Sequence, residues 1–181
     1  VKMAQGGSTV TVDADDLSVR AEVTGGAGAD TLVIKGGSAD IKQWELSGVE
    51  TIKLGALASG LDFSAKNTAD VETIVVTKDT GAVNAKFNGL EDVDMTVQVQ
   101  GKSAGAGTIS LDHSGATTLK IDTPAKAGTV DDNAFNVTLG KSSAVNATVA
   151  KDMNYTGTIT AAKAESVELA VKGAVTGATL A

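Results

Sequence analysis

The chain has 181 residues, which is enough for one domain with a buried core. Hydrophobic residues make up 42% of it and aromatic residues only 3%, so Val, Ile, Leu and Ala must build that core. The net charge of −7 argues against nucleic-acid binding, which requires a basic surface. Because the chain has no Cys, a disulfide framework and a thiolate zinc site are both excluded.

The sequence also sets expectations about the domain and its surroundings. No apolar run approaches the length of a membrane span, so we expect no insertion into a bilayer. We expect a single domain over residues 1–181. The first residues, VKMAQGGSTV, start at Val and lack the charged and apolar regions of a signal peptide. We therefore interpret the chain as a fragment of a longer surface protein.

Short strands in which apolar and polar residues alternate recur along the whole chain, as in SGVETIKL (47–54), ADVETIVV (69–76) and AESVELAV (164–171). Such alternation indicates strands with one buried face. The leading apolar residues of successive strands are Val10, Leu32, Ile52, Ile74, Val93, Leu119, Val145 and Val167, spaced 19 to 26 residues apart. The side chains expected to point inward are Leu32, Ile34, Ile52, Leu54, Ile74, Val76, Val93, Val97, Leu119, Ile121, Val167 and Leu169.

A second strand follows the first within each repeat. Its apolar residues are Val19, Ile41, Leu61 and Val83, each nine residues after the leading residue, and then Ile109, Phe135 and Ile159. A repeat of strand, turn, strand and turn predicts an all-β fold, a parallel right-handed β-solenoid (β-helix) with coils of about 22 residues. An antiparallel sandwich is the alternative, because Asn88 and Gly89 are typical of a hairpin turn.

The stretch GGAGADTLV at 25–33 has the spacing of a calcium-binding turn. It matches the repeat unit G-G-x-G-x-D-x-U-x of calcium-binding β-solenoids, in which U is apolar. Glycines allow the backbone to turn its carbonyl oxygens inward, and Ca²⁺ takes about six to eight oxygen ligands. We therefore expect Ca²⁺ at Asp30, in the turn that contains Gly26 and Gly28. The residues expected to complete the site are Asp13, Asp15, Asp16 and Asp40.

Acidic residues recur two positions before the leading apolar residue of several repeats. Asp30 shares this position with Glu50, Glu72, Glu91 and Glu165. Stacked coils would bring these carboxylates close together, and such a column can recruit a cation. Alternatively, each carboxylate accepts hydrogen bonds from the N–H groups of a turn or pairs with a lysine. Both interpretations stay open for the glutamates.

Three phrases carry a family resemblance: GGAGADTL (25–32), LSGVETIKL (46–54) and TADVETIVV (68–76). With the Ala-, Thr-, Gly- and Val-rich background, the chain resembles bacterial type I-secreted surface-layer (S-layer) proteins with RTX-like calcium-binding repeats. The resemblance implies a secreted β-solenoid that binds Ca²⁺ at Gly-Asp turns and assembles into a coat on the cell surface. The chain departs from the RTX pattern because it lacks tandem nonapeptides, which puts multiple ions in doubt.

Few residues suggest catalysis. His113 is the only histidine, and we expect it on a solvent-facing turn. Trp44 is expected to fill space in the second set of strands. We therefore expect no enzyme, but a structural component of an extracellular surface layer that self-associates with neighbouring subunits or domains, assisted by Ca²⁺. The alternative is an adhesin-type module for a host glycan or receptor, and a cell-envelope polysaccharide is a further candidate partner.

Overall fold

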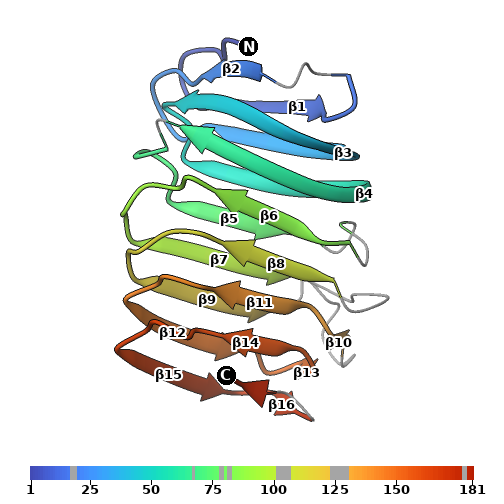
Figure 1. Ribbon diagram of the computed structural model, residues 1–181, viewed down its shortest axis with the longest axis vertical. Helices are drawn as coiled ribbons and strands as arrows, with labels where there is room; N and C mark the ends of the chain where they lie inside the picture. Colours follow the sequence, from blue (N-terminus) through green and yellow to red (C-terminus); the bar gives the residue numbers. More distant parts are fainter. Residues whose placement is uncertain are drawn as a thin grey trace.

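The computed structural model describes residues 1–16, 20–66, 68–77, 80, 83–100, 107–122, 131–176 and 179–181. The side chains of residues 38–42, 59, 131 and 179 also lie outside this description. Strands stack on one another from the N-terminus to the C-terminus along the long axis of the molecule (Figure 1). Within the described ranges every regular element is a strand, so no helix there could cross a membrane.

One face of the stack is built from the first strand of each coil. Its strands, in stacking order, are β1 (Thr9–Asp13), the first half of β3 (Thr31–Ser47), the first half of β4 (Thr51–Lys66), β5 (Thr73–Val76), β7 (Met95–Gln100), β9 (Thr117–Asp122), β12 (Ala144–Val149) and β15 (Ser166–Val171). All of these neighbours pair in parallel.

The opposite face is built from the second strand of each coil. Its strands are β2 (Arg20–Thr24), the second halves of β3 and β4, β6 (Ala85–Asn88), β8 (Thr108–Leu111), β11 (Asn136–Leu139), β14 (Thr158–Thr160) and β17 (Thr179–Leu180). A short third sheet contains β10 (Asp131–Asn133), β13 (Met153–Tyr155) and β16 (Ala174–Val175). Every pairing in the described part is parallel, which confirms the β-solenoid and excludes the sandwich.

The two longest strands, β3 and β4, continue around the corner between the two faces and join them into one sheet. Their mutual register shifts between Ile34 and Ile41, where the chain bends. Gly36 lies in this bend with a φ of +74°, a conformation that costs glycine little and most other residues more. The bend explains why a single strand supplies residues to both faces.

The strand register confirms a repeat of about 22 residues, but in the later coils the leading apolar position is not the one that the sequence predicts. Ile52 lies opposite Ile74, as expected, but Ile74 lies opposite Val97. Val93 therefore does not lead its coil, because it precedes β7 in the turn. In the next coils Leu119 lies opposite Ala147, a step of 28 residues (147 minus 119), so the leading position falls two residues after Val145.

The core lies between the two faces, and most of the side chains expected there are buried. Exposure is 1% or less for Leu32, Ile34, Ile52, Leu54, Ile74, Val76, Val97, Leu119 and Ile121. Val93 is only half-buried because it lies in a turn. Leu169 is 38% exposed and Val167 half-buried because β15 is the last strand of its face in the described chain. Each fully buried aliphatic side chain contributes about 1.5–3 kcal/mol to folding.

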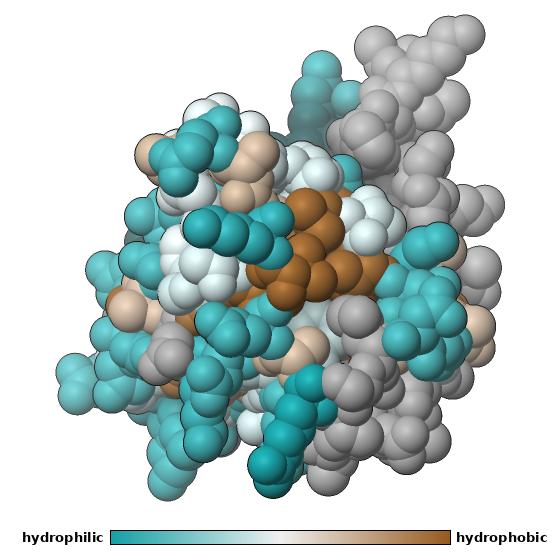
Figure 2. Space-filling model, turned by 90° about the horizontal axis from the view of Figure 1, so that it is seen from above, coloured by the Kyte–Doolittle hydropathy of each residue, from teal (hydrophilic) through white to brown (hydrophobic). Residues whose placement is uncertain are grey.

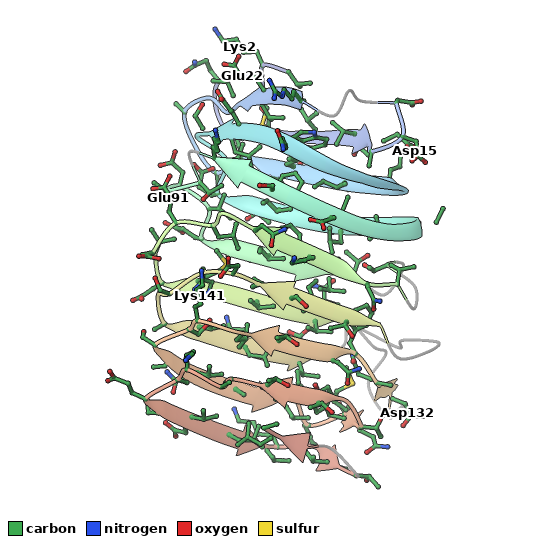
Figure 3. The ribbon with its side chains drawn as sticks, viewed as in Figure 1. Lys2, Asp15, Glu22, Glu91, Asp132 and Lys141 are labelled. Carbon is green, nitrogen blue, oxygen red and sulfur yellow. The ribbon has the colours of Figure 1, made fainter. Side chains whose placement is uncertain are left out.

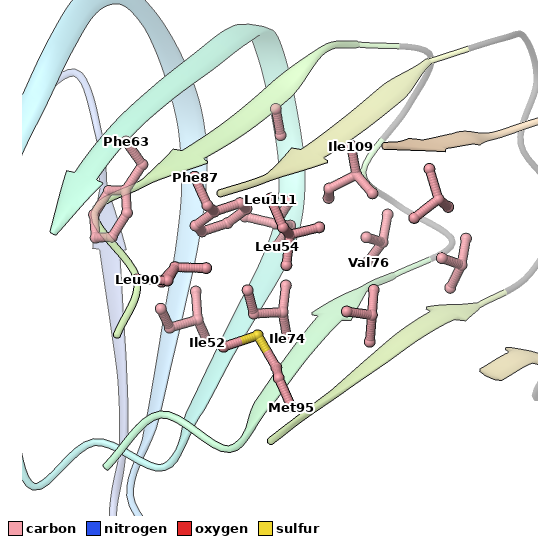
Figure 4. Packing of buried hydrophobic residues seen from close by; sticks show 14 of the residues in the cluster. Ile52, Leu54, Phe63, Ile74, Val76, Phe87, Leu90, Met95, Ile109 and Leu111 are labelled. Carbon is pink, nitrogen blue, oxygen red and sulfur yellow. The ribbon is translucent and has the colours of Figure 1, made fainter. Parts of the chain in front are cut away.

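Aromatic side chains pack together in the core near the first coils. Trp44 is 1% exposed and packs edge-on against Phe63, with ring centroids 5.2 Å apart. Phe63 in turn packs against Phe87 of the next coil at 5.6 Å. Figure 4 shows Phe63 and Phe87 above a row formed by Ile52, Ile74 and Met95 from the opposite face. The expectation that Trp44 fills space among the second strands is confirmed.

Candidate functional site

Asp30 lies fully buried in the turn that precedes β3. Its Oδ1 accepts a hydrogen bond from the backbone N–H of Ser8 at 2.6 Å, and its Oδ2 accepts one from the N–H of Gly26 at 2.5 Å. Ser8 belongs to the preceding coil, so this carboxylate joins consecutive coils. Because both oxygens accept hydrogen bonds from backbone N–H groups, these bonds replace the water that the buried carboxylate loses.

Other acidic residues repeat this arrangement in later coils. Glu50 Oε2 accepts from the N–H of Asp30 at 2.5 Å, and Glu91 Oε1 accepts from the N–H of Thr68 at 3.1 Å. Asp70, two positions from the expected column, accepts from the N–H of a turn glycine at 2.8 Å. We call Asp30, Glu50, Asp70 and Glu91 the carboxylate ladder.

For Glu50 and Glu91, the carboxylate ladder decides between the two interpretations of the acidic column, cation binding and hydrogen bonds from turn N–H groups. Glu50 and Glu91 accept turn N–H groups, as one interpretation expects. Glu91 is held on both sides, because its own N–H donates to Thr68 Oγ1 at 2.9 Å. Glu72 and Glu165 are exposed. The described ladder therefore attaches each turn to its neighbour through charge-assisted hydrogen bonds, which are stronger than neutral ones.

The glycines expected to bind calcium have a packing role in this turn. A Cβ on Gly26 would lie 2.3 Å from the carbonyl oxygen of Ala4, so any side chain would displace the backbone of the first coil. Gly28 adopts a φ of +99°, which disfavours other residues. The N–H of Gly26 points at Asp30, and these observations explain the glycines without requiring an ion.

A second acidic group lies in the turn that follows β1. Asp13 Oδ1 accepts from the N–H of Asp15 at 3.1 Å, and Asp13 Oδ2 lies 3.8 Å from Lys35 Nζ. Asp15 Oδ2 accepts weakly from the N–H of Gly37 at 3.4 Å. The side chains of Asp15 and Asp16 are exposed. We call Asp13, Asp15 and Asp16 the acidic turn; it presents carboxylate oxygens to solvent.

The structure does not bring Asp30 and the acidic turn together. Ser8 lies beside Asp30, whereas Asp13 lies five residues further along, roughly 16 Å at about 3.3 Å per residue. Figure 3 shows the corresponding separation, with Asp15 and Glu91 at opposite edges of the molecule. Ca²⁺ binds its oxygens at about 2.3–2.6 Å, so one ion does not contact both groups.

Calcium binding at either turn stays a prediction. In the part of the chain that the structure describes, no three His, Cys, Asp or Glu side chains converge as a metal site would require. The side chain of Asp40 lies outside the described residues. The acidic turn is the better candidate of the two, because its oxygens are accessible whereas those of Asp30 are occupied.

His113 contradicts the expectation of a solvent-facing turn. It is 2% exposed, and its Nε2 lies 3.0 Å from Thr117 Oγ1. Thr117 and Ser142, also buried, place their hydroxyl oxygens 2.8 Å apart. Three polar side chains therefore share an inward-facing corner of the coil. Thr68, in the turn before β5, is also buried. Buried polar residues therefore recur at this corner of the coil, but they give only a weak signal in the sequence.

The outer face over β2, β3 and β4 contains a solvent-open hollow of about 520 Å³, lined among others by Arg20, Gln43, Glu45, Ser64 and Lys66. This volume is within the range of small-molecule sites. Most of the residues that line it are polar, and they carry both signs of charge. Tyr155 is buried in the core, as Trp44 is, and donates its hydroxyl to the carbonyl oxygen of Phe135 at 2.9 Å, so neither ring provides a stacking platform on the surface.

No protein-family model, no curated protein and no solved structure matches the chain. Its class is therefore defined by the fold alone, as a parallel β-solenoid. Its function must be argued from the chemistry of its own surfaces.

Proposed function

We propose that this chain is a non-catalytic structural segment of an extracellular bacterial surface layer, which self-associates with neighbouring subunits or domains and is assisted by Ca²⁺. The proposal combines the S-layer resemblance of GGAGADTL and the related phrases with one surface of the solenoid. That surface is formed by β15, β16 and β17, and we call it the C-terminal edge.

The exposed strands of the C-terminal edge carry the proposal. In the described chain, β15 pairs only with β12, β16 only with β13 and β17 only with β14, so one side of each strand has no strand partner. Unpaired strand edges are templates for association with another chain. The large apolar side chains exposed here are Leu169, Val171, Val175 and Leu180, at 36–52% exposure.

The opposite end of the solenoid is different. Residues 1–3 lie along β2, with a parallel bridge between Lys2 and Thr24, and Met3 is buried in the core. Figure 2 looks down on this end, where hydrophilic residues surround an apolar area. The exposed apolar side chains of the C-terminal edge therefore favour a contact in which a further coil covers this edge, from a neighbouring subunit or from a neighbouring domain of the same protein. Such a contact leaves the long faces of the solenoid available for lateral contacts.

The proposed role of calcium rests on the acidic turn. Asp15 and Asp16 expose carboxylates at the edge of the molecule, far from the C-terminal edge (Figure 3). Oxygen ligands from an adjacent subunit would complete the coordination that an isolated turn lacks. Calcium would then join subunits side by side, whereas the apolar edge joins them end to end.

The hollow over β2, β3 and β4 favours a second candidate function, an adhesin-type module that binds a glycan or receptor. Its size fits a small ligand, and Gln43 and Lys66 supply hydrogen-bond donors. Trp44 is among the residues that line this hollow, but it is only 1% exposed, so the hollow is a weaker sugar site than is usual for stacking recognition.

Analytical ultracentrifugation over a concentration series, in calcium and in chelator, tests the proposal. The matched variants are Leu169→Glu, which places a charge on the apolar side of β15, and Ala170→Glu, which places it on the outer side. For the 181-residue chain, we expect the unsubstituted form and Ala170→Glu to associate through this edge and Leu169→Glu to stay monomeric. Calcium should add larger species, visible as ordered arrays by electron microscopy. Monomers under all conditions, together with a specific signal on a glycan array, would instead support the adhesin.

A further inference from the structure

Three successive turns, one from each of three stacked coils, surround the buried corner that contains His113. Its own turn joins β8 to β9, the turn of Asp92 and Asp94 lies in the preceding coil, and the turn of Ser142 lies in the following one. The N–H of Ser143 donates to the carbonyl oxygens of Ser114 and Gly115 at 3.2 and 3.3 Å. The turn of His113 is therefore the connection between its two neighbours.

The imidazole is only partly satisfied in this corner. Nε2 is within hydrogen-bond distance of Thr117 Oγ1, which lies next to Ser142 Oγ, whereas Nδ1 is buried and has no hydrogen-bond partner. A neutral imidazole leaves one ring nitrogen unpaired here. An imidazolium would add a charge and a second N–H donor without an acceptor, and both are costly in a buried site.

Charged groups around the corner lie on all three turns. Asp92 accepts from the hydroxyl of Ser114, and Asp94 Oδ1 accepts from the N–H of Ala116 at 3.1 Å. On the following turn Lys141 Nζ forms an ion pair with Asp112 Oδ1 at 2.8 Å. The carboxylates of Asp92 and Asp94 belong to exposed residues. An imidazolium that left the corner would therefore meet three carboxylates near the surface.

We propose that the turn of His113 is a pH-sensitive latch between coils, in which protonation of His113 at mildly acidic pH releases its contact with Thr117, the residue bonded to Ser142 of the next coil, and opens the turns on either side. In the opened state, the imidazolium N–H that is buried and unpaired in the closed turn contacts solvent and the carboxylates of Asp92, Asp94 and Asp112. The only chemical change is the gain of one proton by the imidazole, and the latch closes again when the proton leaves.

The direction of the pH effect follows from burial. Burial lowers the pKa of His113 below the ordinary 6.5. The carboxylate of Asp92, a backbone interaction within His113 itself, and the carboxylates of Asp112 and Asp94 offset only part of this pKa shift. The opened turn therefore binds a proton more readily than the closed turn. The latch is fully stable above about pH 6.5 and weakens as the pH falls, with the opening constant rising by up to about tenfold per pH unit until the pKa of the closed state is reached.

The first test is an NMR titration of the wild-type protein. His113 is the only histidine, so a protein purified without a histidine tag gives a single imidazole signal. We expect this signal to titrate with a pKa below 6.5. A value at or above 6.5 overturns the latch, because protonation would then favour the closed turn.

The second test is amide hydrogen exchange between pH 7.5 and 5.5, corrected for intrinsic rates. Protection of the Ala116 and Ser143 amides should fall by up to about tenfold per pH unit below 6.5. Protection at Thr51, bonded in a distant turn, should stay constant. In His113→Gln, which does not titrate, the pH dependence at Ala116 and Ser143 should disappear. Unchanged protection in wild type, or the same loss in His113→Gln, would refute the latch.

Discussion

Replacing Asp30 with asparagine tests whether the carboxylate ladder holds the first coils together. The side chain is fully buried, and each of its oxygens accepts one backbone N–H, from Ser8 and from Gly26. Asparagine keeps the shape but turns one oxygen into an NH₂ group. One donor would then face another donor, and one buried backbone N–H would lose its acceptor.

The cost of Asp30→Asn has two parts. Losing a hydrogen bond to a charged group costs about 1.5–3 kcal/mol, and an unsatisfied buried N–H costs about 1–3 kcal/mol. Because these contributions overlap, we expect the free energy of unfolding to fall by about 3 kcal/mol. For a chain of this length the Tm should fall by about 6–12 °C, at about 2–4 °C per kcal/mol.

Glu50→Gln is the matched control. Like Asp30→Asn, it removes one negative charge without changing the shape. Glu50 accepts from the N–H of Asp30 through one oxygen, and the described contacts give its second oxygen no partner. The amide can therefore keep its oxygen on that N–H, and we expect a loss of about 1 kcal/mol or less.

The assay is thermal and urea unfolding followed by circular dichroism, in calcium and in chelator. The ladder predicts that Asp30→Asn loses the same stability in both solutions. Equal losses for Asp30→Asn and Glu50→Gln would refute the reasoning about paired donors. A loss confined to the calcium solution would mean that Asp30 binds the cation after all.

Three further perturbations test the packing and the ion. Gly25→Ala should lower stability by about 1–3 kcal/mol or more in urea unfolding, because its Cβ would lie 1.5 Å from the carbonyl oxygen of Gly48, whereas Gly140→Ala, with open space around it, should change little. Ile74→Asp should unfold the chain, since an unpaired buried carboxylate costs several kcal/mol, and exposed Lys53→Asp should leave the circular dichroism spectrum unchanged. Millimolar calcium should raise the Tm relative to chelator if it binds only the folded state; an unchanged Tm would count against a calcium site.

The sequence predicts the fold well because the coil repeats, but it does not fix the register of every coil. Val93, Met95 and Val97 all fall on the same phase of an alternating pattern, so a slip of two or four residues leaves the pattern unchanged. Only the neighbouring coil decides, by placing Val97 against Ile74. The same ambiguity affects Val145 and Ala147.

The sequence predicts a glycine-rich turn at Asp30, and the structure places Asp30 in a turn with Gly26. Calcium binding at this turn stays a prediction. A sequence does not reveal whether N–H groups or carbonyl oxygens face the carboxylate, because this depends on peptide orientation in the turn. The prediction for His113 was wrong for a related reason: a polar residue at the corner faces inward when a partner lies there. That partner is Thr117, which is itself bonded to Ser142 of the next coil.

Disulfide cross-linking tests the parallel register most directly, because the natural chain has no Cys. In the structure Thr118 lies opposite Asn146, and Lys120 lies opposite Thr148. The double variants Thr118→Cys with Asn146→Cys, and Lys120→Cys with Thr148→Cys, should both oxidise readily, since adjacent strands hold Cα atoms within the range of about 4.4–6.8 Å that a disulfide requires. Lys120→Cys with Ala144→Cys should not. If that last pair oxidises and the pair at 120 and 148 does not, the strands are antiparallel and the solenoid is wrong.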